Sequence, residues 1–367
     1  MSAPTSRLPT PVPRDGGWAV LGSGAHRLWD RGWFGRPVQD GLWMGAAEVL
    51  DCHRRRGLPQ PSEDWLATAL ESHPSMLYEA EALGALRYPG QRVILQENLG
   101  AVGQVCRHPK TWALRWTQER RPTESEPVAE VRWVREREGI DWDELADWVS
   151  AVEAGERIPE ILIVDDEHNV VTYHACLVDP SGSLPKPAEL SVDARQRIAR
   201  AWASAKETAG GHWLPVAMAD WPLPGIGIDL EGGVWLDDLQ SRLVSRVINP
   251  TLPQQEGTAG NLAAMLDDLV GRGILVRPGT KYGTRWRGYD GPIDADHAPW
   301  LFAPEAEAPT DWAEAILNAR LAAGVHKIFV CGLAPAVGRP GLGAREWTYL
   351  GIARPPSDAR WSNPHRH

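Results

Sequence analysis

The sequence predicts an α+β protein made of two related halves, each of which mixes helices with short strands. A chain of 367 residues is long enough for two domains with separate hydrophobic cores. Each half ends in a pair of apolar runs that are typical of paired strands. Apolar residues at helical spacing precede both pairs, so neither half is purely helical or purely β.

Elements of the first half follow from periodicity and stop signals. Residues 1–17 are polar and rich in proline, and we expect them to form a disordered tail. A helix is predicted over Leu42–Leu50, with Gly57 as the stop signal behind it. A second helix is predicted over Asp141–Val152, because its tryptophan, leucine and valine residues repeat along one face. This half then closes with strands at 161–164 and 170–173 around a polar turn.

The second half repeats this ending. After a Pro/Gly-punctuated linker at 180–187, helices are predicted over Ser191–Thr208 and Asn261–Arg272, and a strand starts at Ile274. Residues 210–260, rich in Gly, Pro and Trp, give no assignment. The closing strands are 327–331 and 347–350. Aligning the two closing pairs places Glu160 where Lys327 stands, which indicates an internal duplication in which only the second copy keeps the cation.

The distribution of charge suits a local anionic ligand. A net charge of −10 argues against a protein that coats nucleic acid nonspecifically, because phosphate binding needs a basic face. Five cations nevertheless gather between residues 272 and 287, while acids concentrate elsewhere. A solvated charged hairpin is the ordinary alternative for this basic segment.

Cysteine spacing and hydropathy limit which cofactors and which cellular location we expect. The four cysteines form no C-x-x-C pair, so the sequence predicts neither a zinc site nor a disulfide framework, and we expect no cofactor and no metal. No apolar run approaches the length that crosses a bilayer, and the N-terminus lacks the hydrophobic core of a signal peptide. We therefore expect a cytoplasmic protein that does not bind membranes.

Three residue types near the C-terminus form a candidate catalytic set. Residues 281–289 read KYGTRWRGY and end at Tyr289, residues 296–302 read DHAPWLF and contain His297, and Lys327 leads an apolar strand. A phenol, an imidazole and an ammonium can act as proton acceptor, proton donor and charge stabiliser in phosphodiester transesterification. Each residue alone has an ordinary structural explanation, so the order and local context of the three carry the prediction.

These motifs resemble the catalytic half of the archaeal tRNA-intron endonucleases, in which K-(F/Y)-G-x-x-(F/W)-R-x-Y is followed by H-x-x-(Y/W)-L and a strand-leading lysine. The resemblance implies cleavage of precursor tRNA at a bulge-helix-bulge, independent of metal, to give 2′,3′-cyclic phosphate and 5′-hydroxyl ends. It casts Tyr289 as general base, His297 as general acid and Lys327 as charge stabiliser. Gly288 departs from the pattern, because a β-branched residue usually precedes the tyrosine.

The resemblance also implies a domain plan of two tandem endonuclease-like repeats, each with an N-terminal mixed α/β subdomain and a C-terminal sheet-plus-helix nuclease subdomain. The expected boundaries are a tail at 1–17, a non-catalytic first repeat at 18–180, a linker with the N-terminal part of the second repeat at 181–260, and a catalytic domain at 261–367.

RNA contacts and self-association are implied in the same way. Arg320 and Arg354, by family position, and the motif cations Arg285 and Arg287 are expected to bind the RNA. Tandem-repeat members pair as homodimers through an acidic loop of the non-catalytic repeat, which corresponds here to the hairpin tip Asp165, Asp166 and Glu167. The alternative for this tip is an ordinary solvated turn.

Two other functions stay open at this point. One is a non-catalytic RNA-binding or structural subunit with the same fold, although such a subunit has no reason to keep all three catalytic residue types. The other is a metal-dependent nuclease, although no D…(D/E)-x-K cluster lies near the basic segment. Loss of activity with a chelator would separate the metal enzyme from the other two.

Overall fold

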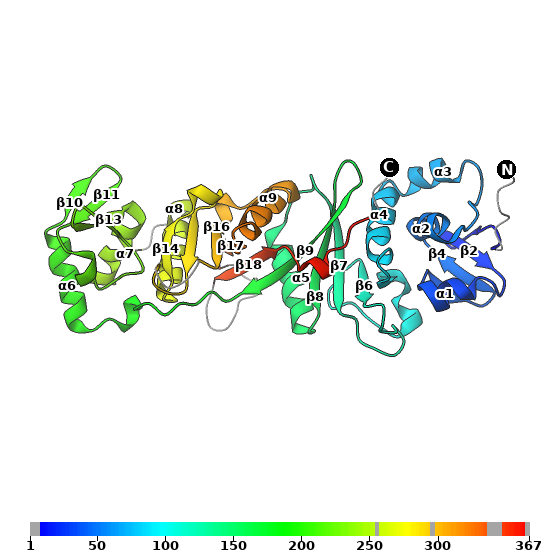
Figure 1. The fold of residues 1–367 in the computed structure, drawn as a ribbon, viewed down its shortest axis with the longest axis horizontal. Helices are drawn as coiled ribbons and strands as arrows, with labels where there is room; N and C mark the ends of the chain where they lie inside the picture. The colour runs from blue at the N-terminus through cyan, green and yellow to red at the C-terminus, as the bar shows by residue number, and fades with distance from the viewer. Residues whose placement is uncertain (1–7, 254–256, 294–297, 336–346, 364–367) are drawn as a thin grey trace. The chain divides into compact units, whose positions relative to one another are not determined.

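The computed structural model describes residues 8–253, 257–293, 298–335 and 347–363. The chain divides into two compact units (Figure 1). The first unit holds the described residues up to Ala175, together with 311–313 and the segment that starts at Arg354. The second unit holds the rest. Residues from Arg354 onward, predicted within the C-terminal domain, therefore belong to the first unit, where Trp361 is part of the hydrophobic core.

The first unit begins with a four-stranded sheet in the order β1-β2-β4-β3. The elements of this part are β1 Val12–Arg14, β2 Gly17–Leu21, α1 His26–Gly32, β3 Arg36–Val38, β4 Gly41–Met44, α2 Ala46–Arg56, α3 Trp65–Ser72 and α4 Met76–Arg87. Two predictions are corrected here. Residues 12–14 pair with β2 instead of lying in a disordered tail. Residues 42–44 form β4, and the helix starts only at Ala46, because Gly45 is extended and acts as its N-cap. Gly57, in the left-handed region at φ +66°, ends α2 as predicted.

Five neighbouring strands complete the first unit in the order β5-β6-β7-β8-β9. Its elements are β5 Arg92–Leu95, β6 Ala113–Trp116, β7 Ala129–Arg135, α5 Trp142–Ala154, β8 Ile158–Val164 and β9 Val170–Val178. Helix α5 connects the parallel strands β7 and β8, and the other pairs are antiparallel. The predicted helix and closing hairpin are confirmed, and the Asp141 carboxylate caps α5 by accepting from the Glu144 amide.

The second unit also opens with a four-stranded sheet, in the order β10-β11-β13-β12. Its elements are α6 Val192–Ala203, β10 Lys206–Thr208, β11 Gly211–Leu214, β12 Ile228–Leu230, β13 Gly233–Asp237, α7 Asp238–Ile248 and α8 Gly257–Gly271. The helix predicted to reach Thr208 ends at Ala203, and residues 206–208 form β10. The segment 210–260, unassigned from sequence, supplies most of this sheet together with α7.

Five further neighbouring strands of the second unit have the order β14-β15-β16-β17-β18. Its elements are β14 Leu275–Pro278, β15 Trp286–Tyr289, β16 Trp300–Pro304, α9 Trp312–Ala323, β17 Ile328–Leu333 and β18 Thr348–Ala353. Helix α9 connects the parallel strands β16 and β17, and the other pairs are antiparallel. Within this unit, a core cluster joins α8 to the face of the sheet that carries Val276, Trp286 and Phe302.

The predicted α+β class is confirmed, since both units combine helices with sheets that are mostly antiparallel. The strand sets β5–β9 and β14–β18 have the same sequence of connections, with one helix between the single parallel strand pair of each set. In the described parts of the chain, none of the helices has the length and apolar character that a membrane span requires.

Candidate active site

Tyr289 is the last residue of β15 and is 9% exposed. Its cross-strand partner is Leu275 in β14. Tyr289 forms a small apolar cluster with Leu184, Leu275 and Ala298, away from the core cluster that joins α8 to the sheet. This position follows from strand alternation, because Trp286 and Gly288 face the α8 core and Arg287 and Tyr289 face the other side.

The local sequence explains why β15 starts where it does. Residues 280–282 form a single 3-10 turn, and Gly283 ends it in the left-handed region at φ +71°. The amide of Gly279 then donates to the carbonyl of Arg285, which closes the loop between β14 and β15. The glycine of the motif is thus needed for the turn, and the aromatic residue Trp286 for the core.

The departure at Gly288 has a steric reason. A Cβ atom at this position would lie 2.5 Å from Cε2 of Phe302 and 3.2 Å from Cγ2 of Ile274. Phe302 is fully buried and packs edge-on against Tyr349, with ring centroids 5.8 Å apart. In this chain the Phe302 ring therefore fills the space that a larger residue at 288 would need.

Lys327 lies at the junction between α9 and β17. Its amide donates to the carbonyl of Ala322, and His326 before it takes the left-handed conformation at φ +57°. The side chain is half-buried, and its Nζ donates to the carbonyl oxygen of Ala298 at 2.7 Å. The adjacent amide of Ile328 donates to the carbonyl of Pro299. These bonds hold the lysine beside the segment that leads into β16.

His297 lies outside the described residues, so its side chain has no described position. Its chain neighbour Ala298 is described, and it is the point where the other two predicted catalytic residues meet. Tyr289 shares an apolar cluster with Ala298, and the Lys327 ammonium binds the Ala298 carbonyl.

Two arginines surround Tyr289 with positive charge. The guanidinium carbon of Arg287 lies 5.7 Å from the Tyr289 ring centroid. Arg277 is the cross-strand partner of Arg287 and is 7% exposed. Burial lowers the pKa of Arg277 to about 10, an effect that Tyr289 opposes and the charge of Arg287 strengthens. The sequence includes Arg277 in its basic segment, but only strand pairing brings it to this side of the sheet.

The segment at 182–184 also approaches this region, although the sequence predicts it as part of a linker. The amide and hydroxyl of Ser183 both donate to the carbonyl of Asp290, the residue that follows Tyr289. The amide of Leu184 donates to the carbonyl of Gly273. This segment therefore packs along the end of β15, and no local sequence signal marks that contact.

Comparison with known families gives a match for the part of the chain that contains these residues. Residues 263–337 match the family model for the tRNA intron endonuclease, catalytic C-terminal domain. This segment is a tRNA intron endonuclease catalytic domain. It contains Tyr289, His297 and Lys327, and the match supports an endonuclease that acts on RNA in tRNA splicing. A search of curated proteins gives no match to the chain.

The predicted RNA-binding arginines of the endonuclease occupy different settings. Arg320 is exposed on α9, and Arg354 is exposed directly after β18. Arg285 is engaged, because it pairs with Glu307 at 3.2 Å and lies over the Trp286 ring. Arg287 is half-buried, and its Nε atom is buried without a hydrogen-bond partner. Arg320 and Arg354 thus have the accessibility that an RNA contact needs.

The first unit places a different residue at the position of the endonuclease lysine. The amides of Arg157 and Lys327 both donate to the helix residue five positions earlier, and the preceding residues Glu156 and His326 share φ values of 56° and 57°. Arg157, not Glu160, is therefore the backbone equivalent of Lys327. The prediction that Glu160 stands at the position of Lys327 is therefore wrong. It aligned the two strands by sequence alone and did not use the ends of the preceding helices, so the register was shifted.

Arg157 is nevertheless not available as a second catalytic cation. It is 5% exposed and forms ion pairs with Glu130 at 2.7 Å and Glu126 at 3.1 Å. Following the same strand pairing across the sheet brings Trp116, not a tyrosine, to the position of Tyr289. The sequence does contain a signal for this register. The motif D-W-x-E opens both crossover helices, at Asp141 and at Asp311, and Asp141 precedes Arg157 by the same number of residues as Asp311 precedes Lys327.

The acidic tip is a tight turn in the structure. The Asp165 carboxylate accepts from the amides of Glu167 and Asn169, so this acid holds the turn together. Asp166 and Glu167 are exposed. The neighbouring His168 stacks on Tyr78, with ring centroids 4.4 Å apart. Only two of the three predicted interface acids therefore present their charge to solvent.

Within residues 8–253, 257–293, 298–335 and 347–363, no group of three or more His, Cys, Asp or Glu side chains is arranged to hold a metal ion.

Proposed function

We propose that this endonuclease cleaves precursor tRNA at the intron-exon junctions of a bulge-helix-bulge by transesterification, with Tyr289 as general base, His297 as general acid and Lys327 as charge stabiliser. The observation that carries the proposal is the meeting point at Ala298. Tyr289 clusters with this residue, Lys327 binds its carbonyl, and His297 precedes it directly in the chain.

The reaction requires two proton transfers and one anionic transition state. The 2′-oxygen gives its proton to the Tyr289 phenolate and forms a bond to the adjacent phosphorus. The bond from phosphorus to the 5′-oxygen breaks, and His297 gives its proton to that leaving oxygen. The products are a 2′,3′-cyclic phosphate and a 5′-hydroxyl.

The surroundings suit these roles. Arg287 and Arg277 place positive charge beside Tyr289 on the same side of the sheet. An ammonium near the scissile phosphate stabilises the charge that develops on its oxygens. Lys327 is well suited, because one backbone carbonyl positions it and no carboxylate of the described residues forms an ion pair with it.

We also propose that the two units are copies of one ancestral unit and that two chains pair as a homodimer. The matching strand connections, the equivalent backbone at Arg157 and Lys327, and the shared D-W-x-E motif support the duplication. The exposed charges of Asp166 and Glu167 support a role of the tip in pairing. A homodimer would present two active sites to the two bulges of one RNA.

The test is to incubate the purified chain with a bulge-helix-bulge RNA and to analyse the product ends. We expect cyclic phosphate and 5′-hydroxyl ends, and full activity in excess EDTA. Tyr289→Phe and His297→Ala should each slow single-turnover cleavage by roughly 10²–10⁴-fold without loss of RNA binding, because each removes one positioned proton-transfer group.

Tyr282→Phe is the matched control, since it removes a phenol from the same motif outside the Tyr289 cluster. Near wild-type cleavage by both site variants would show that the assignment is wrong. Products with 5′-phosphate ends, or activity lost in EDTA, would favour the metal-dependent nuclease. RNA binding without any cleavage by the wild-type chain would favour the non-catalytic subunit.

A further inference from the structure

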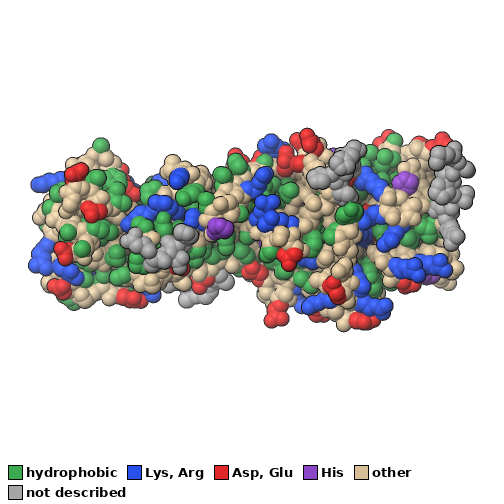
Figure 2. All heavy atoms as spheres, viewed as in Figure 1, with side chains coloured by type: hydrophobic (Ala, Val, Ile, Leu, Met, Phe, Trp, Pro, Cys, Tyr) green, Lys and Arg blue, Asp and Glu red, His purple; other side chains and the backbone are tan. Residues whose placement is uncertain are grey.

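A pocket of about 190 Å³ in the first unit has an unusual lining. Five of its residues are arginines and none is acidic, although the chain as a whole carries a net charge of −10. The arginines come from the last turns of α1, α2 and α4 and from the start of β5; they are Arg31, Arg55, Arg56, Arg87 and Arg92. On the face drawn in Figure 2, Lys and Arg side chains gather over the region of these helices.

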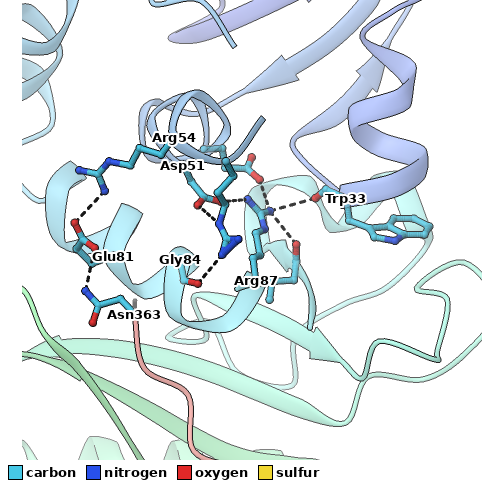
Figure 3. A network of polar contacts seen from close by, with 10 residues as sticks. Trp33, Asp51, Arg54, Glu81, Gly84, Arg87 and Asn363 are labelled. Atoms are coloured by element: carbon cyan, nitrogen blue, oxygen red, sulfur yellow. Dashed lines mark hydrogen bonds and ion pairs between the residues drawn. The ribbon is translucent and has the colours of Figure 1, made fainter. Parts of the chain in front are cut away.

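The floor of this arginine pocket is fixed by buried acids. Arg87 is 7% exposed and binds Glu48 at 2.8 Å, Asp51 at 3.0 Å, and the carbonyls of Trp33 and Val93 (Figure 3). Arg55 also binds Asp51, at 2.7 Å, and donates to the carbonyl of Gly84. Glu48 and Asp51 thus balance two of the five positive charges.

Three guanidinium charges remain at the mouth. Arg92 donates through Nη1 to the carbonyl of Arg120. A hydrogen bond from Thr117, with a smaller contribution from the charge of Arg92, lowers the pKa of the exposed Glu119. Arg31 and Arg56 are exposed and, among the described residues, neither has a carboxylate within ion-pair distance. Both lie in the last turn of a helix, where a cation is modestly favourable, but that effect does not explain why they converge on one pocket.

We propose that the arginine pocket binds a phosphodiester group of the RNA substrate. Guanidinium groups match phosphate oxygens in a bidentate geometry, and convergent arginines are the usual protein site for such a group. An acidic chain that acts on a polyanion needs local positive sites to offset general repulsion. The proposal rests on the proposed function only in its choice of RNA as the ligand.

A second copy of the chain is a less favoured occupant. The acidic tip offers only Asp166 and Glu167 as free charges, because Asp165 is occupied within its turn. RNA supplies a continuous row of phosphates, so it satisfies three converging cations more completely.

The test uses a precursor tRNA with 2′-deoxynucleotides at both splice sites, in buffer with EDTA, so that affinity is measured without cleavage. The variant Arg31→Gln/Arg56→Gln should bind this RNA roughly tenfold more weakly than the wild-type chain at moderate salt. The slope of log affinity against log salt should fall in magnitude by about 1, because the contact with one phosphate is lost.

Arg121→Gln/Arg135→Gln is the matched control. It removes the same charge from exposed arginines of the same unit, each of which forms an ion pair with a glutamate three residues away. We expect this control to bind like the wild-type chain. Equal affinity and slope for the pocket and control variants would overturn the proposal. The proposal would also be overturned if light scattering showed that the pocket variant no longer self-associates while its affinity for RNA is unchanged.

Failure of this proposal and failure of the proposed function give different results. A wild-type chain that binds the RNA through the pocket but cleaves no normal substrate would contradict only the proposed function. A chain that cleaves normally and whose affinity does not depend on Arg31 and Arg56 would contradict only the pocket.

Discussion

Replacing Gly288 by alanine tests the packing beside Tyr289 most directly. The added Cβ would lie 2.5 Å from Cε2 of Phe302, whereas carbon atoms in ordinary contact are about 3.5–4.0 Å apart. The Phe302 ring would therefore have to move by about 1 Å within a core where it has no exposed surface.

Two opposing effects set the magnitude. Overpacking a core by one carbon costs about 1–3 kcal/mol. Replacing glycine by alanine at a compatible site gains about 0.4–1 kcal/mol, because the unfolded chain loses conformational freedom. The steric cost is the larger, so we expect a net loss of up to about 2.6 kcal/mol in the free energy of unfolding of the second unit. For a domain of this size that loss lowers Tm by several degrees.

Thermal unfolding followed by circular dichroism and single-turnover cleavage measure the two consequences, stability and the placement of Tyr289. Gly291→Ala is the matched control, since the nearest atom to its Cβ would be the Ser183 hydroxyl at 3.7 Å, an ordinary contact. Phe302→Leu in the Gly288→Ala background should recover part of the loss, because a smaller side chain makes room. If Gly288→Ala unfolds at or above the wild-type temperature, or if the second substitution brings no recovery, the steric explanation is refuted.

Two further predictions concern the first unit. Asp166→Lys/Glu167→Lys keeps the turn that Asp165 stabilises but reverses the exposed charge of the tip. We expect light scattering at moderate salt to show loss of the proposed homodimer. A variant that stays dimeric and active would show that the tip is an ordinary solvated turn. Glu160→Gln should lower Tm at pH 7, because buried Arg115 loses its ion-pair partner. Burial alone would raise the pKa of Glu160, but Arg115 and His174 hold that pKa below its ordinary 4.5, so the stabilisation by Glu160 is lost as the pH falls through the lower value. The difference in Tm between variant and wild type should therefore narrow below pH 4.5, and a constant difference would contradict this account.

The sequence by itself determined those features that depend on neighbours along the chain. The cap at Asp141 and the periodicity behind it define α5, and β-branched runs around a polar turn define β8 and β9. Residues 281–289 carry the turn glycine, the core tryptophan and the tyrosine in one short motif, which is why the family could be named before the fold was known. The catalytic roles of Tyr289, His297 and Lys327 stay a prediction.

Tertiary structure decided the features that depend on residues far apart in the chain. The change from strand to helix at Gly45 is set by pairing of β4 with β2 and β3, which overrides an apolar pattern compatible with helix. The equivalence of Arg157 and Lys327 is recognised only from the backbone hydrogen bonds at the helix ends. The convergence on Ala298 depends on a hydrogen bond between Lys327 and a residue 29 positions earlier in the chain.

The arginine pocket shows the same limit most clearly. Its five cations are spread from residue 31 to residue 92, and along the sequence each resembles an ordinary helix-end or surface arginine. They form one site only because α1, α2, α4 and β5 pack around a shared core with Glu48 and Asp51 buried beneath them. Local propensity acts over a few residues, whereas the placement of charge in space is fixed by packing between distant segments.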